Sequence, residues 1–205
     1  MISKSENFLR VLEGKKPAWI PVECPLDPRY GGGAYQFVWY QGALPPHQGG
    51  YDLWGTHWTQ AAQEELPYID AVPLAQLEEI LDFRFPDLSE DQLWEDARQS
   101  ILLYQPEKAL VARQVSALWE RLYFLYGFER SLRALIVNTD LVAEALDLIL
   151  EWQITAAEKF ISLGVDAARI SDDYGTQESL LISPELWRQL IFPRLKALID
   201  VYQRA

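Results

Sequence analysis

Apolar residues recur along the chain with two different periods. The longest helical pattern begins at Asp140 and ends before Gly164. Val142, Leu146, Ile149, Ile154 and Ala157 fall on one face of it. The same spacing predicts further helices over 5–13, 73–81, 89–102, 118–126, 129–137 and 184–203. Short runs of apolar and β-branched residues lie between these helices, and we interpret the runs as strands.

Strands near residues 19–24, 52–58, 109–116 and 167–172 therefore alternate with helices. Such alternation predicts an α/β fold with a mainly parallel sheet and right-handed crossovers. Pro25 to Gly50 is rich in glycine, proline and aromatic residues, and it is predicted to be a long loop of functional or mobile character.

Composition narrows the range of functions. The 205 residues are 49% hydrophobic, which is enough for a substantial core. Thirty acidic against 18 basic side chains give a net charge of −12. Nucleic acids and anionic membranes need a basic surface, so neither is an expected partner.

Cysteine and terminal patterns indicate the compartment. Cys24 is the sole cysteine, which excludes an internal disulfide and fits a reducing environment. The first seventeen residues lack the apolar core of a signal peptide, and no apolar run reaches membrane-spanning length. We expect a cytoplasmic protein.

The segment from Asp166 to Pro193 carries the clearest candidate chemistry. The strand pattern of Ala167–Ser171 ends in two adjacent acids, Asp172 and Asp173, and a new helix begins near Pro184. Polar groups at the carboxyl ends of strands form the active sites of α/β barrels. Two carboxylates facing each other in a pocket would also raise the pKa of one of them. We therefore predict an active-site segment here.

The sequence resembles a known family in four segments: NFLRVLEGKKPAWIPVE, YDLWGTHW, FERSLRAL and GVDAARISDDYGTQESLLISPELWRQLIFPRLK. It is similar to the uroporphyrinogen decarboxylase family, and closer to the branch with corrinoid and coenzyme M methyltransferases. The resemblance implies a TIM (β/α)8 barrel. Because that barrel is longer, residues 1–205 are expected to be its N-terminal half, one domain truncated after the fourth βα unit.

The resemblance also implies site residues. In the decarboxylases an arginine-bearing loop after the first strand holds substrate carboxylates, and here it contains Arg29 and Tyr30. An aspartate after the second strand matches Asp52. A Trp-x3-Tyr-x3-Gly pattern with an active-site tyrosine matches Tyr123, between Trp119 and Gly127. The acidic loop after the fourth strand matches Asp172, Asp173 and Tyr174.

Each of these residues could instead have a structural role or simply face solvent, which is its plainer alternative. One of Asp172 and Asp173 could cap a turn while the other faces water. Tyr123 could be a core tyrosine on a helix face, and Arg29 a solvated loop residue. Asp52 could cap the turn before Gly55.

No metal and no cofactor are expected. Decarboxylation in the family proceeds without a cofactor. The methyltransferase branch binds zinc through a His-x-Cys pair and a distant cysteine from the other half of the barrel. Here Cys24, His47 and His57 are the only residues of these types, and their spacing does not suit zinc. Histidine 57 is interpreted as packed or exposed, and Cys24 as a small buried hydrophobe.

The resemblance implies decarboxylation of a tetrapyrrole acetate, with methyl transfer from a corrinoid as the alternative. The other alternative is a truncated or split-gene fragment that needs a partner half. In either case a small molecule, tetrapyrrole or methyl-corrinoid, is the expected substrate. A half-barrel would expose two sheet edges, so we expect a homo-oligomer or a complex with a complementary half-barrel, and no activity from the chain alone.

Overall fold

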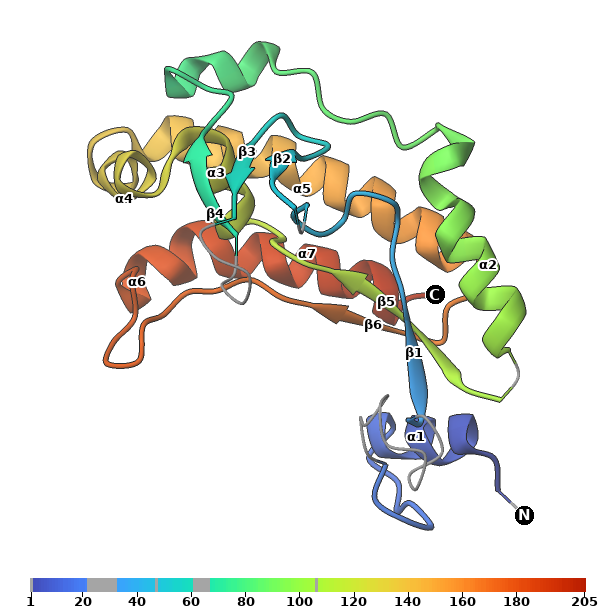
Figure 1. Cartoon of the computed structure of the whole chain (residues 1–205). Coiled ribbons are helices and arrows are strands. Elements are labelled where there is room, and N and C mark those ends of the chain that lie inside the picture. The colour runs from blue at the N-terminus through green and yellow to red at the C-terminus, as the bar shows by residue number, and fades with distance from the viewer. Residues whose placement is uncertain (1, 22–32, 47, 61–66, 106) are drawn as a thin grey trace. The chain divides into compact units, whose positions relative to one another are not determined.

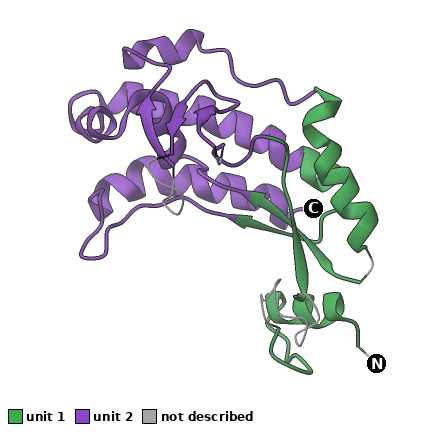
Figure 2. Ribbon diagram, viewed as in Figure 1, with its two compact units in different colours: residues 1–41, 90–113, 159–169 green, residues 42–89, 114–158, 170–205 purple. Residues whose placement is uncertain are grey.

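The structure is a computed structural model, and it describes residues 2–21, 33–46, 48–60, 67–105 and 107–205. The described chain divides into two compact units (Figure 2). Unit 1 comprises residues 1–41, 90–113 and 159–169, and unit 2 comprises 42–89, 114–158 and 170–205.

A three-stranded sheet is the centre of unit 1. Its strands β1 (Tyr35–Val38), β5 (Ala109–Gln114) and β6 (Ala167–Ile170) lie in the order β1-β5-β6 (Figure 1). Strands β1 and β5 are parallel, with Tyr35 opposite Ala109. The N–H of Asp166 donates to the Leu110 carbonyl and that of Ser171 to the Gln114 carbonyl, so β6 runs in the same direction.

Helices α1 (Lys4–Leu12) and α2 (Glu95–Tyr104) contact strand β1 of this sheet. Helix α1 is capped by Ser3, whose hydroxyl accepts from the N–H of Glu6 at 3.0 Å. A 3-10 turn, η3 (Asp91–Trp94), leads into α2. The ring of Trp94 packs on Tyr40 and Phe160 and is fully buried. These aromatic contacts form the core of the unit.

Unit 2 begins with a small antiparallel sheet. Strands β2 (Gly50–Tyr51), β3 (His57–Thr59) and β4 (Tyr68–Ala71) pair in that order, and the 3-10 helix η2 (Leu77–Asp82) follows. The β2–β3 turn contains Gly55 with φ of +81°, a backbone conformation that favours glycine.

The remaining helices of unit 2 form its core. They are α3 (Trp119–Tyr126), α4 (Phe128–Val137), most of α5 (Thr139–Ser162), α6 (Pro184–Leu186) and α7 (Phe192–Gln203). A π-helical turn, η4 (Trp187–Ile191), joins α6 to α7 just before Pro193, which has no N–H to continue an α-helical ladder. The fully buried side chains of Leu122, Leu146 and Ile149 pack in this unit.

The predicted α/β fold is confirmed, but the parallel strand predicted at 52–58 is wrong, and the described part of 19–24 is not a strand. Trp19 to Pro21 is not a strand, and the rest of the range 19–24 lies outside the described residues. The range 52–58 is the turn and start of an antiparallel hairpin. The predicted 25–50 loop contains the parallel strand β1. Strands β5 and β6 and most of the predicted helices are found near their expected positions. The helix predicted over 73–81 is instead the 3-10 helix η2, and 73–76 are not helical.

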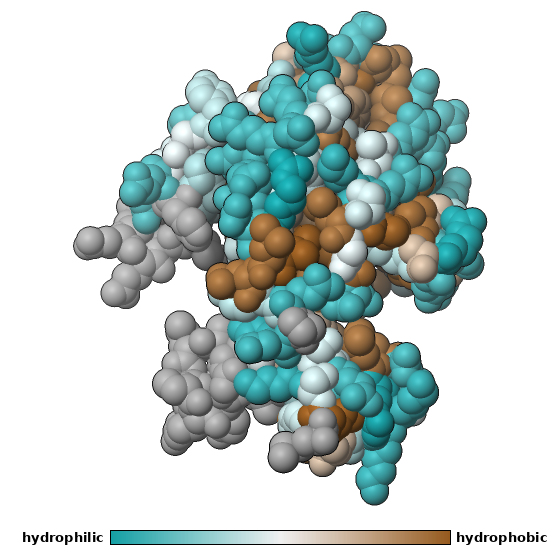
Figure 3. Space-filling model, turned by 90° about the vertical axis from the view of Figure 1, so that its right-hand side faces the viewer, coloured by the Kyte–Doolittle hydropathy of each residue, from teal (hydrophilic) through white to brown (hydrophobic). Residues whose placement is uncertain are grey.

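In the described part of the chain, no helix has the length and apolarity needed to cross a bilayer. Figure 3, which views the α2 side, shows hydrophobic residues exposed in patches among hydrophilic ones. Leu102 and Leu103 of α2 are 76% and 72% exposed.

Candidate active site

Asp172, directly after β6, holds the start of helix α3. Its Oδ2 accepts hydrogen bonds from the N–H groups of Leu118 (3.1 Å) and Trp119 (2.8 Å), and its Oδ1 from that of Glu120 (2.8 Å). The helix has no capping side chain of its own at Leu118. Asp172 therefore caps α3 from a distant segment, and its negative charge lies at the positive end of the helix dipole.

The turn that brings α3 to Asp172 has an unusual backbone. Ser116 has φ of +53°, in the left-handed region that non-glycine residues rarely occupy. The next residue, Ala117, donates its N–H to the Ser171 carbonyl at 3.2 Å. The segments after β5 and β6 are thereby joined where both strands end.

Glu120 lies in the first turn of α3, beside Asp172. The pKa of its carboxyl is raised from the ordinary 4.5 to about 7. Burial is the largest cause, and the nearby charge of Asp172 is the second. A hydrogen bond from the backbone of Asp173 acts in the opposite direction. Burial also raises the pKa of Asp172, against the lowering effect of its backbone donors. Two carboxyls that share a buried space thus have protonation equilibria displaced toward neutral pH.

Two tyrosines border these carboxyls. The hydroxyl of Tyr123, one turn after Glu120, lies 3.4 Å from Glu120 Oε1. Burial and the charge of Glu120 raise the pKa of Tyr123. Burial and Asp172 do the same for Tyr174. The Tyr174 hydroxyl lowers the pKa of Asp172, yet it has no partner in good hydrogen-bond geometry among the described residues. Both hydroxyls remain protonated donors at neutral pH.

Asp173 occupies a different environment from Asp172. It is exposed, and its Oδ1 accepts from the N–H of Gly175 at 3.2 Å, which closes a local turn. The plainer alternatives for the acid pair, a cap and a solvated turn, are therefore both present in the structure. Asp172 caps α3, however, rather than the turn that follows it.

Asp52 belongs to the β2–β3 turn. Its Oδ1 accepts from the N–H groups of Trp54 and Thr56, both at 2.9 Å, and its Oδ2 from Trp58 Nε1 at 3.0 Å. Arg121 Nη1 lies 3.7 Å from the same Oδ2, and the two side chains are only 4–5% exposed. These contacts give Asp52 a structural role in the turn, as in its plainer alternative, and a catalytic role stays a prediction.

The structure thus brings Tyr123, Asp172, Asp173 and Tyr174 together and gives Asp52 a separate set of partners. Arg29 and Tyr30 lie outside the described residues, as do Cys24 and His47. Histidine 57 is half-buried on β3, and its Nδ1 is 2.6 Å from Asp70 Oδ1.

Sequence reasoning missed Glu120. It stands between Trp119 and Tyr123 in the pattern that identified the tyrosine, and a glutamate three residues before a tyrosine on a helix shares its face. That spacing was the available signal. What could not be read from it was the approach of Asp172, fifty-two residues later in the chain.

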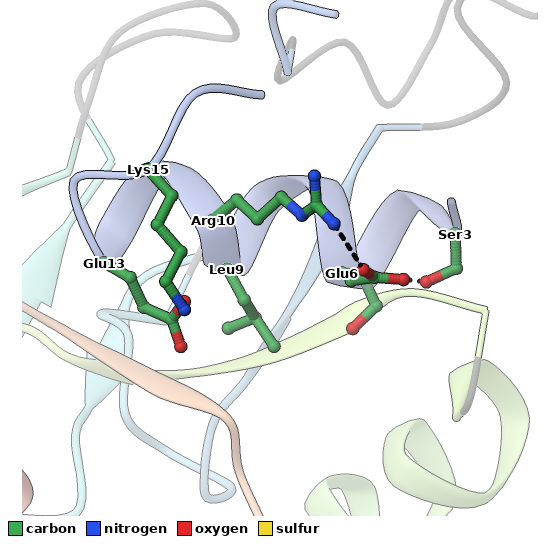
Figure 4. A pocket seen from close by; sticks show the side chains of 7 residues that line it. Ser3, Glu6, Leu9, Arg10, Glu13 and Lys15 are labelled. Carbon is green, nitrogen blue, oxygen red and sulfur yellow. Dashed lines mark hydrogen bonds and ion pairs between the residues drawn. The ribbon is translucent and has the colours of Figure 1, made fainter. Parts of the chain in front are cut away.

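A cavity of about 430 Å³ lies beside α1 in unit 1 (Figure 4). Its charged side chains pair with one another: Arg10 with Glu6 at 3.0 Å, and Lys15 with Glu13 at 2.5 Å. Within the ranges that the structure describes, no three His, Cys, Asp or Glu side chains are placed to hold a metal ion.

Comparison with known proteins identifies the family of the chain. The family model "Uroporphyrinogen decarboxylase (URO-D)" matches residues 55–205. The chain belongs to the uroporphyrinogen decarboxylase family. The matched range contains Glu120, Tyr123 and the acidic loop.

A solved structure, a methyltransferase from Methanosarcina mazei, has the same fold as this member of the uroporphyrinogen decarboxylase family. Its TM-score is 0.68 at 17% sequence identity, and the match covers 98% of this chain and 68% of the other. No match was found among curated protein sequences.

Proposed function

We propose that this chain acts on a small molecule by proton transfer, with Glu120 as the acid, and that the reaction is decarboxylation of an acetate side chain on a tetrapyrrole. The observation that carries the proposal is the Glu120 carboxyl beside Asp172, with a pKa of about 7. A general acid works best when its pKa lies near the working pH.

The chemistry requires such a group. When a proton is added to a pyrrole ring carbon, the ring becomes an electron acceptor, and the bond from the acetate methylene to its carboxylate then breaks. Carbon dioxide leaves, the methylene takes up a proton, and the ring loses the first one, so that one proton is consumed overall. Asp172 and Asp173 would favour the cationic ring electrostatically. Asp52, Tyr30 and Arg29 keep their predicted roles as proposals.

The experiment follows Glu120 directly. Carboxyl ¹³C NMR of the full chain should show one glutamate titrating near pH 7, and this signal should vanish in Glu120→Gln. In a barrel completed by a complementary half, with uroporphyrinogen as substrate, Glu120→Gln should release CO2 about 10²–10⁴-fold more slowly than wild type. Equal rates, or no glutamate titrating near neutral pH, would contradict the proposal.

Methyl transfer is a second candidate, and the structural likeness to the Methanosarcina mazei methyltransferase favours it. Here a thiol acceptor would attack the methyl carbon of methylcob(III)alamin, the carbon–cobalt bond would break with its electron pair left on cob(I)alamin, and Glu120 would accept the proton that the thiol loses. Loss of the methyl group from methylcob(III)alamin, followed by its absorbance, separates the two reactions.

A further inference from the structure

A cavity of about 490 Å³ lies wholly within unit 2, beside the candidate site. Strand β4 and the junction of α3 with α4 supply most of its wall. Tyr123 lines the cavity and also contacts Glu120, so the cavity and the acidic site share one side chain. Its volume suits a small organic ligand.

Three aromatic residues line this cavity: Trp58, Tyr123 and Phe128. The rings of Tyr123 and Phe128 stand at 90° with their centroids 5.2 Å apart, which makes a corner. Trp58 is 5% exposed, whereas Phe128 is 45% exposed. Aromatic ring faces carry negative electrostatic potential, so such an arrangement attracts cations more strongly than neutral groups.

The charge of the cavity lining is negative, like the electrostatic potential of the aromatic ring faces. Asp70 lines it, and its carboxylate is fixed by the Thr59 hydroxyl and by His57 Nδ1, each at 2.6 Å. These hydrogen bonds lower the pKa of Asp70, so it is anionic at neutral pH. The described lining contains no lysine or arginine.

The arginines of the neighbouring helices point to other partners. Arg130 lies over the ring of Tyr126 and donates to the carbonyls of Leu74 and Ala75. Arg121 pairs with Asp52 and lies over Trp54. Neither lines the cavity, although the Arg130 guanidinium lies beside the lining residue Gly127.

We propose that this cavity binds an organic cation, a methylated ammonium group, between the rings of Trp58, Tyr123 and Phe128 and the carboxylate of Asp70. This binding site is independent of the reaction at Glu120.

Choline and its uncharged carbon analogue, 3,3-dimethylbutan-1-ol, test the charge at constant shape. Each is titrated into the full chain at pH 8 and followed by protein NMR shifts. Choline should bind at least about 10-fold more tightly than the alcohol, because only choline gains cation–π and ionic attraction. Equal affinity for the two would overturn the proposal, and so would the absence of saturable binding at about 100 mM choline.

Variants locate the binding. Phe128→Leu keeps an apolar side chain but removes the ring, and it should weaken choline about 3- to 10-fold while leaving the alcohol unchanged. Phe192→Leu is the matched control, because Phe192 is 46% exposed and packs on Trp187 away from the cavity lining. Asp70→Asn should also weaken choline alone. Equal effects of Phe128→Leu and Phe192→Leu would contradict the assignment.

Failure of choline binding would leave the Glu120 proposal standing, since that proposal is tested by the titration of one carboxyl. Conversely, a Glu120 that titrates as an ordinary glutamate would leave the cation site unaffected.

Discussion

At the residue scale, the function of Asp172 depends on contacts that its own neighbourhood in the sequence does not contain. An acid at the end of a strand is visible in the sequence. Its three N–H donors lie between fifty-two and fifty-four residues earlier, at the start of α3. A carboxylate with three such donors is fixed in position, so we regard Asp172 as the group that positions Glu120 rather than one that reacts.

Replacement of Asp172 by Asn tests this interpretation. The amide has one acceptor oxygen for three donors, so helix capping weakens and the stability should fall by about 1 kcal/mol. The pKa of Glu120 should also fall, because the charge of Asp172 helps to raise it. The fall should be smaller than the whole elevation, since burial is the largest cause. Carboxyl NMR titration measures this pKa.

Asp173→Asn is the control for that experiment. Asp173 also raises the pKa of Glu120 through its charge, but this effect ranks below that of Asp172. Its backbone hydrogen bond to Glu120 survives the substitution. The Glu120 pKa should therefore move less than in Asp172→Asn, and an equal or larger movement would contradict the proposed positioning role.

At the element scale, the β2–β3–β4 sheet is attached to the end of α3. The hydroxyl of Thr56 donates to the carbonyl of Phe124 at 3.0 Å, and the N–H of Leu74 to that of Leu125 at 3.0 Å. The last carbonyls of a helix have no partner within the helix, so these contacts satisfy them. Gly127, with φ of +98°, ends α3 at this point. The sheet thereby fixes the helix that carries Glu120 and Tyr123.

Sequence patterns identified the elements with strong periodicity. They failed for strands that form only because they pair with a strand distant in the sequence. Strand β5 was predicted because the sequence from Ala109 to Ser116 is a β-rich run, and its first four positions are buried in the structure. Strand β1 is four residues long and lies among glycines and prolines, so its sequence indicates a loop, and its pairing with β5 makes it a strand. The hairpin at 57–59 likewise depends on β4, across a separation that a local pattern does not reveal.

The buried Asp52–Arg121 pair should be essential to this arrangement. In Asp52→Asn the guanidinium loses its carboxylate partner, and one acceptor for the turn and Trp58 is replaced by a donor. Removal of one member of a buried pair costs about 3–5 kcal/mol, so the urea midpoint should drop sharply.

Asp91→Asn is the comparison for Asp52→Asn. Asp91 pairs with Arg98 at 3.2 Å, but its side chain is 85% exposed. Exposed pairs contribute at most about 1 kcal/mol, so the midpoint should hardly change. If Asp52→Asn were as mild as Asp91→Asn, the hairpin would not depend on the buried ion pair.

At the scale of the whole molecule, the excess of acids has two opposite consequences for stability. Exposed carboxyls such as Asp70 and Glu95 have lowered pKa values, because local hydrogen bonds favour their charged forms. Such groups stabilise the fold at higher pH. The carboxyls of Glu120 and Asp172 have raised pKa values through burial, so they favour the fold at lower pH. A net charge of −12 therefore says little about the pH of greatest stability.

The upward shift of the Glu120 pKa leads to a specific prediction about stability. Between pH 4.5 and about 7 the folded protein keeps a proton that the unfolded chain releases. The resulting stabilisation is fully present below pH 4.5 and is lost as the pH rises through about 7. Because Glu120 is only partly buried and screened by solvent, we expect wild type to lose about 1 kcal/mol relative to Glu120→Gln between pH 5 and 8. Urea unfolding of both proteins across this range measures the difference.

Glu95→Gln provides a control of opposite sign. Hydrogen bonds from Gln99 and Arg98 lower the pKa of Glu95, so its stabilisation is present at neutral pH and is lost as the pH falls through that lowered value. The stability difference between wild type and Glu95→Gln should therefore change on the acid side and stay level from pH 6 to 8. For Glu120→Gln the change should fall in the neutral range. A difference from wild type that is constant between pH 5 and 8 would show that Glu120 does not retain its proton in the folded state, and the proton-transfer proposal would fail with it.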